Sequence, residues 1–467
     1  MLNLVVSART GSYAVCGMES AVIIPPPLRV PKVRKHLSSD ALYALLKTRF
    51  ATIPDHRNDA KATFALTDVL QAAFALFALK DPSLLAFEQR RGDVNLQTIF
   101  RIDQIPCDTQ MRTILDPVNP EHLRPIFNDV LRELQRGKVL EDYVFYGGAY
   151  LLLLDGTGYF SSKKIHCPCC QEKVNKQTGE ITYEHQMLAA VLVHPDHREV
   201  FPFAPEPIQK LDGSTKNDCE RNAAKRLLPK IRAEHPHMQF IVVEDGLASN
   251  APHLRLLKEL GMHFLTGAKP GDHAFLYDRV IDAYDQDRVT TLSWREGNVH
   301  CELAFVNDLP LNESNQDLQV NYLHYAEYGP DGEVQKCFSW VTDLEVTRSN
   351  ARLLMRGARA RWKIENETFN TLKNQGYHYE HNFGHGEQQL SVVLAMLMML
   401  AFLVDQVQQH CCPLFQAVWT KLKSKRSVWE QIRSHFHTLT FHSMQHLCEA
   451  ILYDLTKHLP VPTLDGS

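Results

Sequence analysis

The stretch "YLLLLDGTGYF", residues 150–160, runs four leucines directly into an aspartate, Asp155, and then meets two glycines. A short continuous apolar run that is bounded by glycine predicts a strand buried on both faces. Such a strand delivers a carboxylate at its last position, where the chain leaves the core. The charge must therefore either cap a turn or bind a partner.

A second predicted strand repeats this arrangement. The run "FIVVEDG", residues 240–246, places Asp245 at the end of its apolar residues, separated from them by Glu244 alone. In open α/β sheets, residues at the carboxyl ends of strands face the crevice where ligands bind. Two aspartates side by side there would repel each other unless a cation neutralised them. The alternative is that each aspartate only caps a turn, because Asp-Gly is a common turn dipeptide.

The third acid, Glu365, lies on a long helix predicted over residues 349–374. At about 100° per residue, Glu365 falls in the middle of an apolar stripe, Arg361 at its edge and Glu367 on the solvent side. The stripe contains Leu354, Ala358, Trp362, Phe369 and Leu372. A carboxylate within an apolar stripe needs a partner. Either an ion pair with Arg361 or a cation shared with the two aspartates would supply one.

Three carboxylates are suitable ligands for Mg²⁺ or Mn²⁺. A pair of such ions can activate the attacking oxygen and stabilise the leaving oxygen in a phosphoryl transfer. Basic residues on or beside the same helix would then contact a phosphodiester backbone; these are Arg359, Arg361, Lys363 and Lys373. Trp362 could stack on a flipped base, but its place in the stripe favours packing in the core.

The order of patterns along the chain predicts an α/β fold, with a mixed sheet flanked by helices. The short helices of the N-terminal region suit DNA binding and packing equally well. We expect a flexible leader at 1–40, a helical N-terminal domain at 41–145, the first part of the catalytic core at 146–275, a β-rich insertion at 276–348, the second part of the core with the acidic helix at 349–400, and a helical C-terminal region at 401–467.

The composition is that of an ordinary globular protein, with 44% hydrophobic and 22% charged residues. The net charge of −4 excludes an overall basic field, so contacts with nucleic acid would need local patches. Eleven irregularly spaced cysteines indicate a reducing cytoplasm rather than a disulfide framework. No secretory signal is recognised. The apolar run at 390–404 is shorter than the ~20 residues that span a bilayer, which predicts a buried core helix and no membrane partner.

A cluster of cysteines follows the first strand, in "IHCPCC" at residues 165–170. Cys167 and Cys170 have the C-x₂-C spacing of a zinc site, for which the further ligands would come from His166, Cys169 or His185. No second paired motif at a familiar spacing follows. The sequence therefore favours a reduced cysteine cluster in a hairpin loop, with zinc as the alternative.

A histidine-rich segment, "YHYEHNFGHGEQQ" at residues 377–389, follows the acidic helix. Loop hydrogen bonds are the favoured interpretation for His381 and His385. Contact with DNA, or the positioning of a water, is the alternative.

Together these motifs resemble those of DDE transposases of bacterial insertion sequences, in the branch marked by a Y-R-E-K signature. The resemblance covers roughly residues 146–390. "DGT" at 155–157 resembles the first acid motif, "EDGLASN" the region of the second, and "RWKIE" at 361–365 the Arg-spacer-Glu part of the signature. Two positions depart from it: Ala358 stands where the signature has tyrosine, and Lys373 comes one position later than the signature lysine.

The resemblance implies an RNase H-like fold, with a β insertion before the last acidic helix. It also implies a DNA transposase that cuts at the ends of its element and joins the 3′-hydroxyls to target DNA, using two Mg²⁺ (or Mn²⁺) ions held by Asp155, Asp245 and Glu365. The implied partners are double-stranded DNA with terminal inverted repeats, target DNA and a second copy of the chain, in the bacterial cytoplasm at the nucleoid. Two alternatives stay open: a metal-dependent nuclease without strand transfer, and a non-catalytic DNA-binding derivative.

Overall fold

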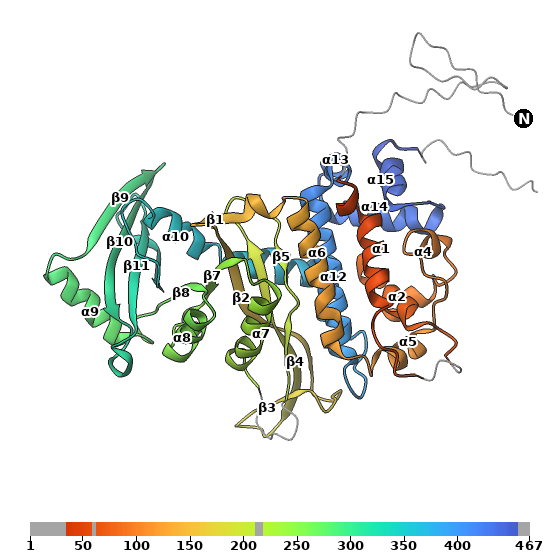
Figure 1. The fold of residues 1–467 in the computed structure, drawn as a ribbon, viewed down its shortest axis with the longest axis horizontal. Coiled ribbons are helices and arrows are strands. Elements are labelled where there is room, and N and C mark those ends of the chain that lie inside the picture. Colours follow the sequence, from red (N-terminus) through yellow and green to blue (C-terminus); the bar gives the residue numbers. More distant parts are fainter. Residues whose placement is uncertain (1–33, 58–61, 211–217, 456–467) are drawn as a thin grey trace, which may run out of the picture.

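The computed structural model describes residues 34–57, 62–210 and 218–455. The molecule is elongated, with a β-rich end, a central sheet and a helical end (Figure 1). Most of the predicted leader lies outside the described residues. The chain is already helical at Lys35, and the Ser38 side chain caps helix α1, Ser39–Phe50, by accepting from the Ala41 N–H. The predicted boundary at residue 40 is therefore a few residues late.

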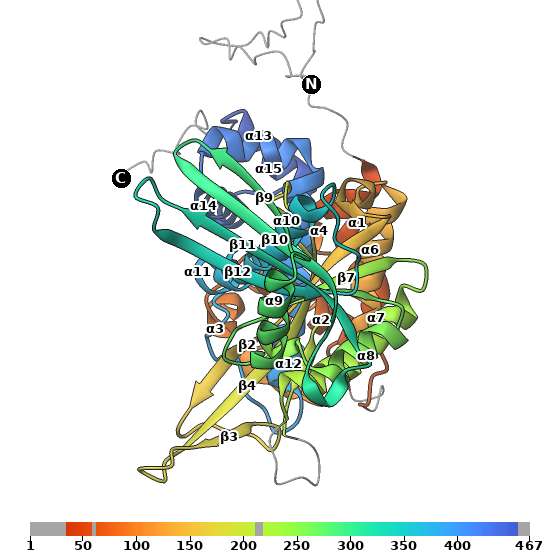
Figure 2. The same cartoon turned by 90° about the vertical axis from the view of Figure 1, so that its left-hand side faces the viewer.

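A mixed sheet of 12 strands runs through the centre and the β-rich end (Figures 1 and 2). Its main order is β3-β4-β2-β7-β8-β12-β11-β10-β9. Strand β7 pairs parallel with β2 on one side and with β8 on the other, and the remaining pairs are antiparallel. The strands of the central part are β1 Val144–Tyr146, β2 Ala149–Ser162, β3 Gln171–Val174, β4 Ile181–Val193, β5 Phe201–Pro202, β6 Glu206–Ile208, β7 Gln239–Glu244 and β8 His263–Gly267.

Strand β2 contains the apolar run, and its four leucines are fully or almost fully buried. The strand does not end at Asp155, as predicted, but continues to Ser162. The reason is that its two neighbours stop at different places. Pairing with β7 ends at Leu153, whereas pairing with β4 continues to Ser162. Asp155 thus lies beyond the end of the parallel pairing, within a strand that continues as one side of a hairpin.

A β-rich insertion precedes the acidic helix, as predicted, but the range predicted to be β-rich begins with a helix, α9 Ala274–Asp285. Its apolar side chains Leu276, Val280 and Ala283 recur at helical spacing and are buried. Strand β12 pairs with β8, so the insertion extends the central sheet instead of forming a separate layer. Its strands are β9 Thr290–Glu296, β10 Val299–Pro310, β11 Gln319–Tyr328 and β12 Val334–Thr342.

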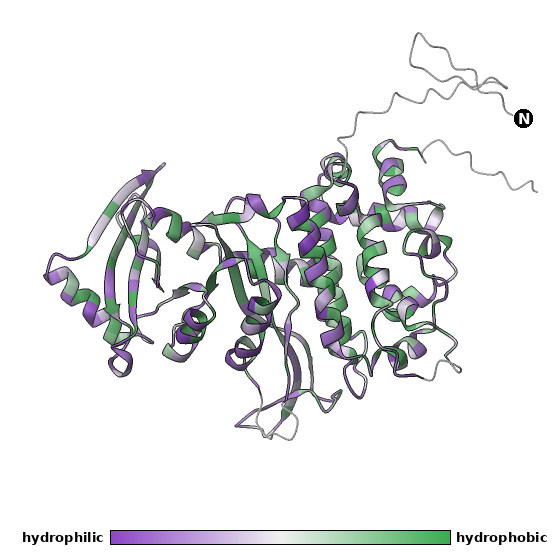
Figure 3. Cartoon of the chain, viewed as in Figure 1, coloured by the Kyte–Doolittle hydropathy of each residue, from purple (hydrophilic) through white to green (hydrophobic). Residues whose placement is uncertain are grey.

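Two helices between the central strands flank the sheet: α7 Glu220–Glu234 and α8 Ala251–Glu259. Both carry hydrophilic residues on their outer faces (Figure 3). Asn250 caps α8 by accepting from the His253 N–H. Two short 3₁₀ turns, η5 Gly246–Ala248 and η6 Glu313–Asn315, complete this part of the chain.

The helix predicted over 349–374 is interrupted. Helix α10, Ala351–Arg359, is followed by a turn at 360–361, by the π-helix η7, Ile364–Phe369, and by α11, Asn370–Asn374. The turn and the π-helix change the direction in which later side chains point. Trp362, predicted in the core, directly follows the turn and is 49% exposed.

Helices from the two ends of the chain pack together into the helical end. The long helix α12 contacts α1, α2, α5, α6 and α13. The packing of the N-terminal region is thereby established, and DNA binding by it stays a prediction. The remaining helices are η1 Lys35–Leu37, α2 Leu66–Ala78, α3 Leu84–Glu88, α4 Val94–Thr98, α5 Asp108–Leu115, η3 Pro120–Leu123, α6 Arg124–Arg136, η4 Leu140–Tyr143, α12 Leu390–Cys411, α13 Pro413–Leu422, α14 Lys425–Thr438 and α15 Met444–Leu452.

Helix α12 has 22 residues, so it is longer than the apolar run suggested and is long and apolar enough to cross a bilayer. Its most apolar window is nevertheless completely buried inside the protein. The prediction of a core helix is confirmed, although the argument from length was wrong. The predicted boundary at residue 400 falls inside α12, because buried residues continue to Gln409.

An ion pair buried in the helical end joins the turn after α2 to α12. The Lys80 ammonium lies 2.6 Å from the Asp405 carboxylate, and both side chains are almost completely buried. The Tyr377 hydroxyl also donates to Asp405. The ammonium lies 3.4 Å from the centroid of the Trp429 ring on α14. This cluster therefore connects three helices and the segment that leads into α12.

Replacing Lys80 by methionine should lower the free energy of unfolding by about 3–5 kcal/mol, because it leaves a buried carboxylate without its counter-charge. The matched control is Arg426→Gln, which removes an exposed pair with Glu430 and should cost less than about 1 kcal/mol. Urea unfolding measures both. Equal losses for the two variants would contradict this account of the cluster.

Candidate functional site

The parallel pairing of β2 with β7 sets the relative height of the two predicted aspartates. The register of this pairing has no shift, and its last pair is Leu153 with Val243. Asp155 lies two residues further along β2, and Asp245 lies two residues further along the chain, directly after the end of β7. Neighbouring strands are about 4.8 Å apart. The two aspartates therefore lie side by side where the parallel pairing stops. Asp245 also accepts a hydrogen bond from the Leu247 N–H, so it caps a turn, as the alternative interpretation proposed.

Glu365, from the π-helix, joins Asp155 through a shared arginine. The Arg361 Nη1 atom lies 2.9 Å from Glu365 Oε1 and 3.6 Å from Asp155 Oδ2. The predicted ion pair between Arg361 and Glu365 is therefore present, and it forms at the same place as the aspartates. Glu365 is 40% exposed rather than enclosed in an apolar stripe.

The environment of Asp155 is unfavourable for a negative charge. Burial is the largest cause that raises the pKa of its carboxyl group, to about 7. Arg361 opposes this shift, whereas the charges of Glu220, Glu365 and Asp245 add to it. Each of these acids is thus near enough for its charge to act on Asp155. A group of carboxylates in which one holds a proton near neutral pH is a group that a cation would stabilise.

Glu220, at the start of α7, is an acid at this place that the sequence analysis missed. Burial raises the pKa of Glu220, and so do the charges of Asp245 and Glu244. Its carboxylate occupies the space that a Cβ atom at Gly156 would need. A glycine inside a strand can signal the close approach of another group. The sequence shows that signal at Gly156, but it does not identify the group that approaches.

The predicted DNA-contacting residues all have protein partners. Arg361 lies between the acids, and Arg359 pairs with Glu327 at 2.7 Å. Lys363 donates to the His197 carbonyl oxygen. Lys373 pairs with Glu380 at 2.8 Å.

A basic groove of about 360 Å³ lies between α10 and the insertion. Its four cationic side chains are half-buried or exposed: Arg352, Arg356, Arg359 and Lys363. None of the three predicted acids lines the groove, but it begins on the helical turn that precedes Arg361. A larger cavity, about 1180 Å³, lies elsewhere, beside the cysteine loop and α7, and the three acids do not line it either.

The π-helix determines which face Lys373 occupies. A residue seven positions after another lies on nearly the same face of an α-helix. A π-helical turn accommodates one additional residue. Lys373 is eight positions after Glu365, and the π-helix absorbs one of these positions. Lys373 therefore lies on nearly the same face of the helix as Glu365, as a residue seven positions later would in an uninterrupted α-helix. Glu367, predicted to face solvent, is only 24% exposed and pairs with Arg198, because the interruption rotates it toward the protein.

The cysteine loop contains a compact cluster. Cys167, Cys170 and His185 lie together, and the fourth member is His385, for which loop hydrogen bonds were predicted. His166, a predicted alternative ligand, is exposed and stacks on Tyr183. The predicted Cys169 donates to the Gln388 carbonyl oxygen instead.

The acids form a donor set that fits a divalent cation. All are carboxylates, which suit hard ions, and the arginine between two of them supplies a positive charge at that position. Asp155, Asp245 and Glu365 would hold such an ion, with Glu220 beside them.

Asp155→Asn should stabilise the protein increasingly as the pH rises. Between about pH 4 and pH 7 the folded protein holds on Asp155 a proton that the unfolded chain has released, because the pKa moves from 3.8 to about 7. The contribution of Asp155 to stability therefore falls as the pH rises through that window, by at most about 4 kcal/mol.

Thermal unfolding in a metal chelator measures this effect. The gain of Asp155→Asn over wild type should be small at pH 4 and largest at pH 8. The exposed control Asp103→Asn should follow wild type at each pH. A constant difference between Asp155→Asn and wild type across this range would contradict the account of the site.

Comparison with known families supplies an independent finding. A family model described as a transposase DDE domain matches residues 151–403, which is more than half of the chain. No curated protein matches the sequence. The match confirms the resemblance to DDE transposases and the RNase H-like fold class. Members of this family generally use divalent metals and act on DNA. The chain therefore belongs to the family of DDE transposases.

Proposed function

We propose that this protein is the transposase of a bacterial insertion sequence, and that Asp155, Asp245 and Glu365 are its catalytic acids. The observation that carries the proposal is their convergence. Two acids lie side by side beyond a parallel strand pair, and the third shares an arginine with one of them. Acids that are 90 and 120 residues apart in sequence have no structural need to meet.

Each acid has a distinct place in the proposed chemistry. Asp155 and Asp245 project from adjacent strands and would hold the scissile phosphate through divalent cations, and Glu365 would close the site from its helix. Two Mg²⁺ or Mn²⁺ ions bound there would activate the attacking oxygen and stabilise the leaving oxygen. Water would first attack phosphorus at the element end, breaking the P–O3′ bond and releasing a 3′-hydroxyl. That hydroxyl would then attack a phosphodiester of target DNA, forming a new P–O bond and displacing the 3′-oxygen of the target strand, which leaves as a hydroxyl.

Arg361 would change partners when cations enter. It now neutralises Asp155 and Glu365, and divalent ions would take over that role. Its guanidinium would then be available to a DNA phosphate, which suits the bidentate geometry of arginine. We propose the same kind of contact for Lys373, because the π-helix returns it to the face expected of the signature lysine.

The basic groove is a candidate path for the DNA backbone. Its residues Arg352, Arg356, Arg359 and Lys363 start next to Arg361 and would contact phosphates without reading sequence. The partners proposed are duplex DNA with terminal inverted repeats, target DNA and a second copy of this chain that holds the other end. We place the protein in the bacterial cytoplasm, at the nucleoid.

Cleavage of DNA that carries the sequences flanking the reading frame tests the assignment. In Mg²⁺, the wild-type protein should nick at the element ends and join the new 3′-hydroxyls to a target. Asp155→Asn, Asp245→Asn and Glu365→Gln should each lower cleavage more than about 100-fold, because even the outer partners of metal ligands are worth 10–100-fold. DNA binding, measured by gel shift, should persist in all three.

The matched control is Glu367→Gln, which removes a neighbouring acid that pairs with Arg198 and should cleave at close to the wild-type rate. Wild-type cleavage by Asp155→Asn would reject the catalytic assignment. Cleavage without joined products would favour the nuclease alternative, and DNA binding without cleavage by the wild-type protein would favour the non-catalytic derivative.

A further inference from the structure

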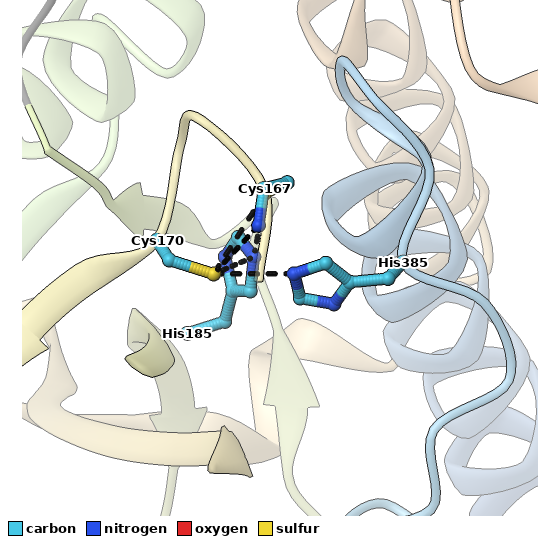
Figure 4. Close-up of side chains that lie close together, drawn as sticks. All are labelled: Cys167, Cys170, His185 and His385. Carbon is cyan, nitrogen blue, oxygen red and sulfur yellow. Dashed lines mark hydrogen bonds between the residues drawn. The ribbon is translucent and has the colours of Figure 1, made fainter. Parts of the chain in front are cut away.

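The cluster formed by Cys167, Cys170, His185 and His385 lies apart from the acids and has no part in the proposed chemistry. The two cysteines come from the loop between β2 and β3, and His185 comes from β4. His385 comes from the segment between α11 and α12 (Figure 4). All four residues are buried. Cys170 and His385 are 215 residues apart in sequence, so the tertiary fold brings this donor set together.

Four of the six donor–donor distances within the cluster are close to those of a tetrahedron around one metal ion, and all four ligand atoms lie within 4.8 Å of one another. With metal–sulfur bonds of about 2.3 Å and metal–nitrogen bonds of about 2.0 Å, tetrahedral geometry places two sulfurs about 3.8 Å apart and a sulfur and a nitrogen about 3.5 Å apart. The two Sγ atoms are 3.8 Å apart. His185 Nε2 lies 3.3 and 3.4 Å from them, and His385 Nε2 lies 3.1 Å from Cys170 Sγ.

The surroundings also suit a metal. The Cys167 N–H donates to Cys170 Sγ at 3.3 Å, a contact that stabilises a thiolate. The Phe160 ring lies 4.4 Å from the His385 ring, and the Tyr159 ring stacks on His185. These aromatic walls limit access of water to the cluster, as is usual around protein metal sites.

His385 is held in place by contacts outside the cluster. The Asp116 carboxylate accepts hydrogen bonds from the N–H groups of Glu387, Gln388 and Leu390. Gly386 has φ +66°, and a Cβ atom there would collide with Asp116. The segment that presents His385 is thus already ordered by the end of α5, and the ligand position does not depend on the metal alone.

We propose that Cys167, Cys170, His185 and His385 bind a structural zinc ion. Two thiolates and two imidazoles in tetrahedral geometry are the donor set of structural zinc sites. The four ligands leave no open position for a substrate. The ion joins two parts of the chain. One is the hairpin formed by β2 and β4, which continues from Asp155, and the other is the segment between α11 and α12, which follows Glu365. It therefore fixes the path of the chain into α12, and this proposal is independent of the catalytic assignment.

Metal analysis of the purified full-length protein tests the proposal. Protein produced with zinc in the medium should retain about one zinc ion per chain after gel filtration. Cys170→Ser and His385→Ala should each lower the zinc content at least about tenfold. His166→Ala and Cys169→Ser change neighbouring residues in or beside the same loop and should retain zinc. Asp155→Asn should also retain zinc, because the zinc site does not depend on the catalytic acids.

A second measurement keeps the test decisive if a ligand variant fails to fold. Co²⁺ added to metal-stripped wild-type protein should give the intense visible bands of a tetrahedral site, together with sulfur-to-cobalt charge transfer. Absence of zinc in the wild-type protein together with weak octahedral cobalt bands would overturn the proposal. So would a disulfide between Cys167 and Cys170 in freshly purified protein, or full zinc content in a folded His385→Ala variant.

Discussion

Repulsion among carboxylates is the constraint on which the rest of the site depends. The parallel pairing of β2 with β7 places Asp155 beside Asp245, and the π-helix adds Glu365. Near these acids the structure supplies Arg361, whose guanidinium contacts two of the three. One arginine does not balance the group, and the pKa of Asp155 therefore rises to about 7, first through burial and then through its acidic neighbours. Such an arrangement destabilises the folded protein unless a bound cation offsets the repulsion.

The strand-borne half of the site was predictable from sequence because it depends on local patterns. An apolar run that ends in an acidic residue predicts a buried strand with a carboxylate at its end, and the strands that lead to Asp155 and Asp245 both have this pattern. What local pattern could not show is where each strand ends, because β2 continues past Asp155 by pairing with β4. The residues "DGTG" therefore form an extended strand here, although they are typical of a turn.

The helix-borne half was predicted less well, since it depends on contacts between distant segments. Periodicity treats residues 349–374 as one α-helix, whereas the turn at 360–361 and the π-helix shift every later side chain. Trp362 consequently lies on the surface. Glu220 and His385 were not assigned to their sites for a related reason. Each reaches its site from a segment whose local pattern does not identify its partner, and only the tertiary structure brings His385 to Cys170.

Location of Mn²⁺ by anomalous scattering, in crystals of this protein, tests the central claim most directly. The account predicts an ion between Asp155 and Asp245 within bonding distance of both carboxylates, with Arg361 moved away from Glu365. Manganese absent from the three acids, at concentrations that support DNA cleavage and with Arg361 still between Asp155 and Glu365, would contradict it.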